Sequence, residues 1–280
     1  MGLYVGGQKV GRIKTIEIPP IEIPREVDSN GVYGFPVSNF SFKLPDEATD
    51  LGASSLSFNF FGCTSLTSVD LSSLSSVSGS DGMFGAFWNC TSLTSVDLSS
   101  LTSVSGDNGM SYSFYGCTSI ASVDLSSLTS VSGRDGMYST FYGCSSLVSV
   151  DLSSLITIGT NSSSTNFRHF SQAFYNCNYL TSLSFPLLEE IYCTGTSSNT
   201  GTFYNNNKIQ KMYFPKLHTV TYGSGATLSN QVGCKNIFYD CSSLTELHFG
   251  AVNQAAIEAS PGYSTAWGRG AGNVSIYFDL

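Results

Sequence analysis

Four aspartates recur at intervals of 27 residues, at Asp70, Asp97, Asp124 and Asp151. Each ends a Ser-Val-Asp triplet, in which the serine and the aspartate would share one face of a strand. If successive copies stack as parallel strands, the carboxylates form a column with neighbours about 4.8 Å apart. Carboxylates that close repel one another, so the column needs compensation. Hydrogen bonds from serine and water are the simplest compensation, and binding of a basic partner or of a cation are the alternatives.

A second column consists of the aromatic residue that follows phenylalanine in each F-aromatic-x-C tetrapeptide. We assign the phenylalanine, such as Phe114, to the core and its neighbour to the surface, because adjacent side chains of an extended chain point to opposite faces. A ladder of aromatic rings stabilises a stack by itself. Aromatic side chains are also frequent anchors of binding sites, for sugars or for proteins, so both interpretations stay open. The candidate binding residues are Trp88, Tyr115, Tyr142, Tyr175, Tyr204 and Tyr239.

The remaining residue types do not suggest catalysis. The three histidines, His169, His218 and His248, have no carboxylate or nucleophile at a motif spacing, and no G-x-S-x-G sequence occurs. A flat row of aspartates offers nothing that would raise the pKa of one carboxylate selectively, as a glycosidase acid pair requires. The Asp-Gly turns lack the spacing of calcium-binding repeats, and no CxxC pair indicates zinc. We therefore predict no enzymatic activity, no cofactor and no metal site.

The elements that position these residues are repeated almost verbatim three times, from Cys63, Cys90 and Cys117, and diverged copies follow. Each copy has an L-x-x-V-x-L strand pattern, a second apolar pair and a closing F-aromatic-x-C. A turn such as Asp81-Gly82 lies between the second apolar pair and the closing tetrapeptide. At this turn we expect the positive φ angles of a tight hairpin. A fixed period of 20–50 residues is typical of a stacked array. Such arrays bury one continuous core and usually bind rather than catalyse.

Composition limits the partners. Only 11% of residues are charged, the net charge is −8, and no cluster of Lys or Arg occurs. We therefore predict no binding to nucleic acid. No apolar run is long enough to span a membrane. Six of the eight cysteines hold one repeat position, which predicts reduced, buried thiols, whereas Cys193 and Cys234 lie outside that column.

The pattern CTSLTSVDLSSL followed by a phenylalanine before the next cysteine resembles the BspA-like class of leucine-rich repeats. The resemblance implies a β-rich repeat solenoid, a curved right-handed array with a parallel sheet along one face and capped ends. We expect a strand-rich cap or attachment segment over residues 1–35, the solenoid over 36–250 and a C-terminal cap over 251–280. Val252–Ala259 is predicted to be a short helix and Asn273–Leu280 a strand. Short strands are also expected around Ile13–Ile23.

Members of this class resemble surface-displayed binding proteins, and close copies of the repeat occur in prophage proteins. We therefore expect a non-enzymatic adhesion module that recognises a protein or glycan on a host cell surface. The alternative is a structural spacer or assembly module of a phage tail or bacterial surface layer. The N-terminal residues lack the apolar stretch of a secretory signal. The expected location is accordingly extracellular, at the cell surface or in a phage particle, reached after removal of a signal or by another route.

Overall fold

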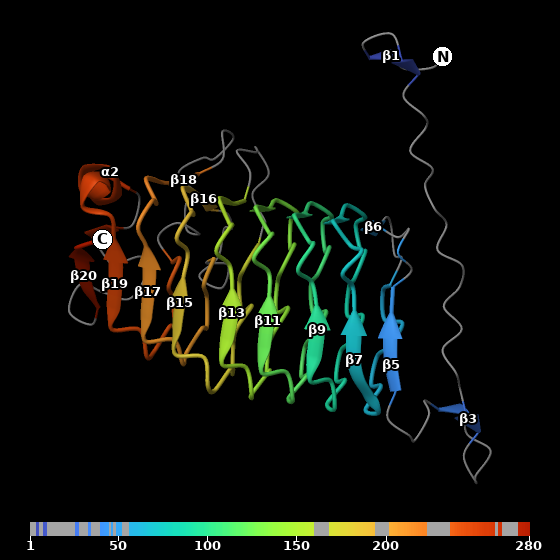
Figure 1. The fold of residues 1–280 in the computed structure, drawn as a ribbon. Helices are drawn as coiled ribbons and strands as arrows, with labels where there is room; N and C mark the ends of the chain where they lie inside the picture. The colour runs from blue at the N-terminus through green and yellow to red at the C-terminus, as the bar shows by residue number, and fades with distance from the viewer. Residues whose placement is uncertain are drawn as a thin grey trace.

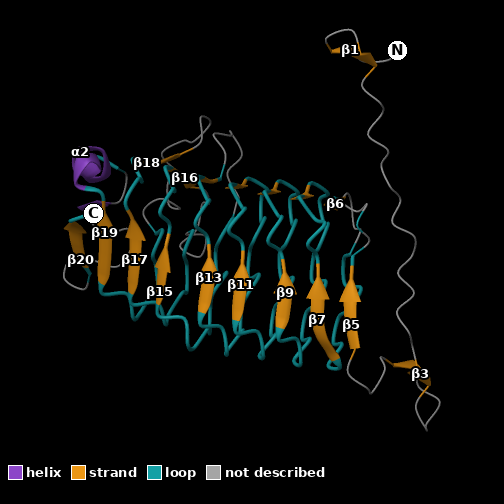
Figure 2. Cartoon of the chain, viewed as in Figure 1, coloured by secondary structure: helices purple, strands orange, loops and turns teal. Residues whose placement is uncertain are grey.

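The chain forms a right-handed solenoid whose rungs stack along one axis (Figure 1). The computed structural model describes residues 4–5, 8–9, 26–27, 33–34, 40–44, 46, 49–51, 56–159, 168–193, 202–222, 236–260, 263–264 and 274–280. Each rung gives a strand to one face, a second strand to another face and a run of turns to a third. Strands and turns dominate the described residues, and the helix labelled α2 lies near the C-terminus (Figure 2). The predicted repeat solenoid is confirmed.

The first face, called the sheet face below, consists of parallel strands formed by the L-x-x-V-x-L patterns. A five-stranded sheet contains β5 (Phe40–Lys43), β7 (Leu66–Asp70), β9 (Ser95–Asp97), β11 (Ser122–Asp124) and β13 (Ser149–Asp151). A four-stranded sheet contains β15 (Ser182–Ser184), β17 (Lys211–Phe214), β19 (Glu246–Phe249) and β20 (Ser275–Phe278). The predicted parallel arrangement is confirmed, and strand pairing along this face is interrupted between β13 and β15. The division between β13 and β15 coincides with the point where the repeat lengthens from 27 to 33 residues.

The second face is a continuous parallel sheet of seven strands built from the second apolar pair of each rung. The last residue of the short strands β8, β10, β12 and β14 is buried, and the residue before it is partly exposed. These strands are β6 (Asp50–Leu51), β8 (Ser76–Val77), β10 (Ser103–Val104), β12 (Ser130–Val131), β14 (Thr157–Ile158), β16 (Glu190–Cys193) and β18 (Thr219–Tyr222).

The third face, called the turn face below, has a backbone pattern of its own. Alternate amides donate to the next rung, as Met83 does to the Gly109 carbonyl at 2.7 Å. The amides between them donate three residues back within the rung, as Ala86 does to Met83 at 3.0 Å. Every turn-face rung is thereby tied both to itself and to its neighbour, which satisfies backbone groups that would otherwise be buried without partners.

The predicted positive φ angles at the Asp-Gly turns were wrong. Left-handed residues lie instead directly before the column cysteines, at positions such as Asn89 (φ 58°) and Gly116 (φ 69°). This explains why Gly, Asn or Asp stands there, since these residues tolerate the left-handed region best. The glycine of the Asn108-Gly109 pair serves close packing instead, because a Cβ on Gly109 would lie 2.7 Å from a Val104 methyl carbon.

The core is a set of columns in which like residues stack on like. The phenylalanine of each F-aromatic pair is buried, and Phe87, Phe114 and Phe141 stack with centroids 5.3 and 5.5 Å apart. The predicted cysteine column is also confirmed, since the six column thiols are reduced and buried. Thiols of this column donate hydrogen bonds to backbone carbonyls of the preceding rung, as Cys90 Sγ does to the Phe60 carbonyl at 3.1 Å. The Cys193 side chain and Cys234 lie outside the described residues.

The ends of the described array partly match the expectations. β5 pairs with β7 and completes the first rung, and β20 pairs with β19 and completes the last. The predicted C-terminal helix is present as a 3₁₀ turn over Ala251–Asn253 and α2 over Gln254–Glu258, with Ile257 buried. In the N-terminal segment, β1 (Tyr4–Val5) pairs with β2 (Gln8–Lys9), and β3 (Glu26–Val27) pairs with β4 (Tyr33–Gly34). The expected strands around residues 13–23 lie outside the described residues, and the proposed segment boundaries stay a prediction.

Candidate binding surfaces

The four aspartates form the predicted column on the sheet face. Cross-strand register pairs Asp70 with Asp97, Asp97 with Asp124 and Asp124 with Asp151. The row continues at its N-terminal end with Lys43, whose Nζ lies 4.0 Å from Asp70 Oδ2 and 2.9 Å from Asp46 Oδ1. Lys43 therefore compensates only the first carboxylate of the column.

Each aspartate also accepts a hydrogen bond from the serine amide two residues later. The distances are 3.0 Å for Ser72 to Asp70, 3.0 Å for Ser99 to Asp97, 2.9 Å for Ser126 to Asp124 and 2.8 Å for Ser153 to Asp151. Hydrogen bonds from Ser126 lower the pKa of Asp124, and those from Ser72 do the same for Asp70. The serine hydrogen bonds predicted from the sequence are thus present. They stabilise the charged forms of Asp70 and Asp124.

Small serine side chains leave shallow hollows along this acidic row. One hollow of about 520 Å³ is lined by residues of β11 and β13 together with Ser184 and Pro186. A second, of about 440 Å³, is lined by residues of β7 and β9 and by Asp124. Both are open dishes on an exposed face, lined by aspartates and serines and by the intervening valines.

The C-terminal end of the sheet face changes character. The row passes through Ser184 and Tyr213 to His248 and Tyr277, which are in register across β15, β17, β19 and β20. The His248 ring stacks between Tyr213 and Tyr277 with centroid distances of 4.8 and 4.7 Å. The same histidine contacts Glu246 and the carboxylate of Asp279, and these two residues were not anticipated from the sequence.

The aromatic column forms a ladder along the turn face. Neighbouring centroids are 5.6 Å apart for Phe61–Trp88, 4.8 Å for Trp88–Tyr115, and 4.5 Å for both Tyr115–Tyr142 and Tyr142–Tyr175. A second stretch joins Tyr204 to Tyr239 at 5.9 Å. The side chains are partly exposed, with Phe61 at 47% and Tyr239 at 40%. The ladder therefore lies at the surface, one position away from the buried phenylalanines.

At the centre of the ladder Tyr115 and Tyr142 stack face to face, whereas Trp88–Tyr115 and Tyr142–Tyr175 are tilted by 40° and 36°. Tyr115 and Tyr142 are nearly parallel, at 8°, so their faces meet and their edges and hydroxyls point away from the stack. Burial raises the pKa of Tyr142 to about 12, with the neighbouring tyrosines adding to the effect, so its hydroxyl stays protonated at neutral pH. A sugar ring needs an open aromatic face. The Tyr115–Tyr142 pair presents ring edges and hydroxyl groups instead.

A second aromatic row beside the ladder was missed from the sequence. Phe58, Phe84, Tyr112 and Tyr138 follow one another with centroids 5.1 to 5.6 Å apart in edge-to-face contacts. Tyr112 also stacks on Trp88 at 5.2 Å, which joins the two rows into one patch. The row escaped notice because Phe58 and Tyr112 stand one position later in their repeats than Phe84 and Tyr138. The signal was available as an excess of aromatic residues between the turn and the F-aromatic pair.

Two further observations concern chemistry and membranes. Among the described residues, no group of three or more His, Cys, Asp or Glu is arranged to hold a metal ion. No helix in the described part of the chain is long and apolar enough to cross a membrane.

Comparison with known families agrees with the geometry. The sequence matches the BspA type leucine rich repeat region, with six copies of the repeat, over residues 33–166 and 85–248. These overlapping ranges cover most of the chain, and the protein belongs to this family. The predicted resemblance is therefore confirmed. A search of curated protein sequences found no match.

Solved structures of bacterial leucine-rich repeat proteins are similar to this chain. A leucine-rich repeat protein from Bacteroides ovatus is 16% identical, with a TM-score of 0.33, and the match covers 89% of this chain and 71% of that one. The Treponema protein described as T. pallidum leucine rich repeat protein is 18% identical, with a TM-score of 0.37 and coverages of 94% and 98%. A leucine rich cell surface protein from Faecalibacterium prausnitzii is 13% identical, with a TM-score of 0.28 and coverages of 90% and 92%. Superpositions this loose add nothing about function.

Proposed function

We propose that this protein is a non-enzymatic binding module that attaches to a protein or glycan on a cell surface, from an extracellular position. The BspA-type repeat fold is typical of surface-binding and adhesion proteins. A solenoid suits the role because its rungs hold the same side chain at regular intervals along a rigid axis. The partner then meets a long surface in which each contact is weak and many are made together.

The observation that carries the proposal is the aromatic patch on the turn face. It combines the ladder from Phe61 to Tyr175 with the row from Phe58 to Tyr138, and all of it is held by backbone bonds between rungs. Rigid aromatic side chains lose little conformational entropy on binding, which is why they dominate interface hot spots. Because ring edges and hydroxyls are presented, a protein surface rich in carbonyl groups suits the patch better than a sugar ring does.

The acidic row on the sheet face is the second candidate surface. Its carboxylates accept hydrogen bonds from serine amides, and Lys43 compensates the charge at one end only. A partner with basic groups spaced along the row would relieve the repulsion between Asp97, Asp124 and Asp151. Such a contact would weaken with added salt, whereas binding to the aromatic patch would change little.

A binding screen of the purified chain against immobilised matrix proteins and glycans, with and without calcium, tests the proposal. Tyr115→Ala with Tyr142→Ala removes the centre of the ladder, and Asp97→Asn with Asp124→Asn removes charge from the centre of the acidic row. We expect a protein ligand whose binding drops at least tenfold in the tyrosine variant and persists without calcium.

The matched control is Asp107→Asn, the same isosteric change at an exposed aspartate outside the acidic row. Loss of binding in the aspartate variant alone would place the site on the sheet face. Equal binding by all variants would show that neither surface is the site. If no protein or glycan binds the wild-type chain, the proposal fails, and a spacer or assembly role takes its place.

A further inference from the structure

Because the rungs are nearly identical, a folding chain can stack a rung on the wrong neighbour. The copies that begin at Cys63, Cys90 and Cys117 place the same residue types at nearly every core position. Core packing therefore distinguishes poorly between the native succession and one in which a rung is looped out and its neighbours stack directly. Misassembly of this kind is a characteristic failure of repeat proteins.

One position that does differ between these copies lies on the turn face. It is the residue before each Gly-Met pair, which is Asp81, Asn108 and Asp135 in successive rungs. Backbone bonds place these residues in adjacent rungs, since the Asn108 amide donates to the Ser80 carbonyl at 2.6 Å. Arg168 takes the equivalent place in the following rung, and its amide donates to the Arg134 carbonyl at 2.8 Å.

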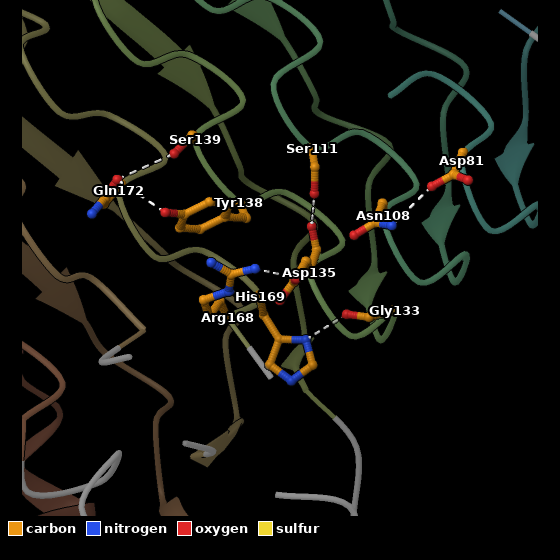
Figure 3. Close-up of polar contacts among 10 residues, drawn as sticks. All are labelled: Asp81, Asn108, Ser111, Gly133, Asp135, Tyr138, Ser139, Arg168, His169 and Gln172. Atoms are coloured by element: carbon orange, nitrogen blue, oxygen red, sulfur yellow. Dashed lines mark hydrogen bonds and ion pairs between the residues drawn. The ribbon is translucent and has the colours of Figure 1, made fainter. Parts of the chain in front are cut away.

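The side chains of this column form complementary pairs (Figure 3). Asn108 Nδ2 donates to Asp81 Oδ1 at 2.8 Å. Arg168 donates twice to Asp135, from Nε at 3.1 Å and from Nη2 at 2.6 Å, and its guanidinium lies 4.0 Å from the Tyr138 ring centroid. The Asp135 side chain is only 8% exposed, so removing Arg168 would leave a buried carboxylate without its cationic partner.

We propose that the column Asp81–Asn108–Asp135–Arg168 fixes the order of the rungs, because skipping either of the two middle rungs by itself breaks a complementary pair. If the rung of Asn108 were skipped, Asp135 would lie against Asp81, two carboxylates about 4.8 Å apart in a largely buried place. If the rung of Asp135 were skipped, Arg168 would face the neutral Asn108 and lose its carboxylate. Each skipped arrangement therefore loses a favourable contact between side chains of this column. The core packing, which is nearly the same in every rung, does not distinguish it from the native arrangement.

The acidic row of the sheet face does not have this capacity. Asp70, Asp97, Asp124 and Asp151 are identical in every rung, so a skipped rung presents the same neighbour as before. These aspartates are also more exposed than Asp135. Water therefore screens their repulsion, and the chain tolerates like charges there.

Asp81→Asn in the full chain separates rung order from stability. The new amide oxygen still accepts the hydrogen bond from Asn108, so the native structure should keep its urea midpoint. The skipped arrangement, however, would gain a favourable contact between the new amide group and the Asp135 carboxylate. Asn108→Asp destabilises the native arrangement instead, because it places three carboxylates at successive positions of the column. The matched control is Asn176→Asp, at a left-handed position that aspartate already occupies in a later rung as Asp240.

The measurement is refolding from urea, followed by size-exclusion chromatography and by limited proteolysis with mass spectrometry. We expect Asp81→Asn and Asn108→Asp to yield a several-fold larger fraction of oligomer, or of chains cleaved within residues 63–143, than the wild type. The Asn176→Asp control should refold like the wild type. If Asn108→Asp fails to fold, Asp81→Asn still decides. The proposal is overturned if Asp81→Asn refolds to the same products as the wild type. It is also overturned if the Asn176→Asp control shows an equal rise in the fraction of oligomer or of cleaved chains.

Discussion

Replacing Phe114 with alanine tests the core assignment directly. The ring is fully buried and stacks between Phe87 and Phe141 at interplanar angles of 8° and 4°. Its removal opens a cavity that the stacked backbone, hydrogen-bonded to the rungs on both sides, has little freedom to fill. Phenylalanine-to-alanine changes in such places cost about 3–5 kcal/mol of unfolding free energy. We expect a value within that range, since two ring pairs disappear together.

Tyr115 is the internal comparison, one residue away. Its ring contacts Trp88 at 4.8 Å and Tyr142 at 4.5 Å, but the side chain is only half-buried. Tyr115→Ala removes three aromatic pairs, with Trp88, Tyr112 and Tyr142, but leaves no closed cavity, so we expect a loss of roughly 2 kcal/mol.

Urea unfolding followed by circular dichroism gives both free energies, and the fluorescence of Trp88 reports on the adjacent rung. Phe114→Leu, which keeps apolar volume at the site, should lose clearly less than Phe114→Ala. The reasoning is refuted if Phe114→Ala unfolds at the wild-type midpoint, or if Tyr115→Ala loses as much stability as Phe114→Ala.

Three further predictions follow from individual residues. Burial raises the pKa of the Cys144 thiol well above its usual value, so this thiol should resist iodoacetamide until urea unfolds the chain, as mass spectrometry of the labelled peptide will report. Burial lowers the pKa of His169 from 6.5 to about 4. Between these two pH values His169 is protonated in the unfolded chain and neutral in the folded chain. The free energy of unfolding should therefore fall by on the order of 3 kcal/mol as the pH drops from about 6.5 to about 4. Urea titrations at several pH values should show a flatter profile for His169→Asn. Gly106→Ala should lower the thermal midpoint severely, because its Cβ would lie 1.8 Å from the Gly79 carbonyl oxygen. At Gly62, where space is open but φ is +69°, the same change should cost only about 1–2 kcal/mol.

Much of the fold was predictable because the repeat imposes it. A verbatim period requires equivalent residues to stack, which placed Phe114 and Cys144 in the core and Tyr115 at the surface. The same reasoning placed Asp97 beside Asp124, and their register pairing follows it. These predictions depend only on periodicity and on the alternation of side chains along an extended chain.

The turn face was harder to predict. Its backbone alternates between bonds to the next rung and bonds within the rung, and this pattern sets which residues adopt positive φ. Tyr112, with φ of 57°, illustrates the difficulty, since no local preference of tyrosine favours that conformation. Stacking against the rungs on either side imposes it, and the second aromatic row becomes visible only once that geometry is known.

The sequence by itself determined that this protein is a solenoid with one core and two long rows of surface side chains, because a repeated sequence repeats its environment. The tertiary structure decided how those rows are presented. The ring faces of Tyr115 and Tyr142 meet one another because the two rings lie 4.5 Å apart and nearly parallel, which leaves their edges for a partner. The pairing of Arg168 with Asp135 likewise depends on which rungs are neighbours. The two residues are distant in the sequence, and the repeat spacing alone does not show that their side chains meet.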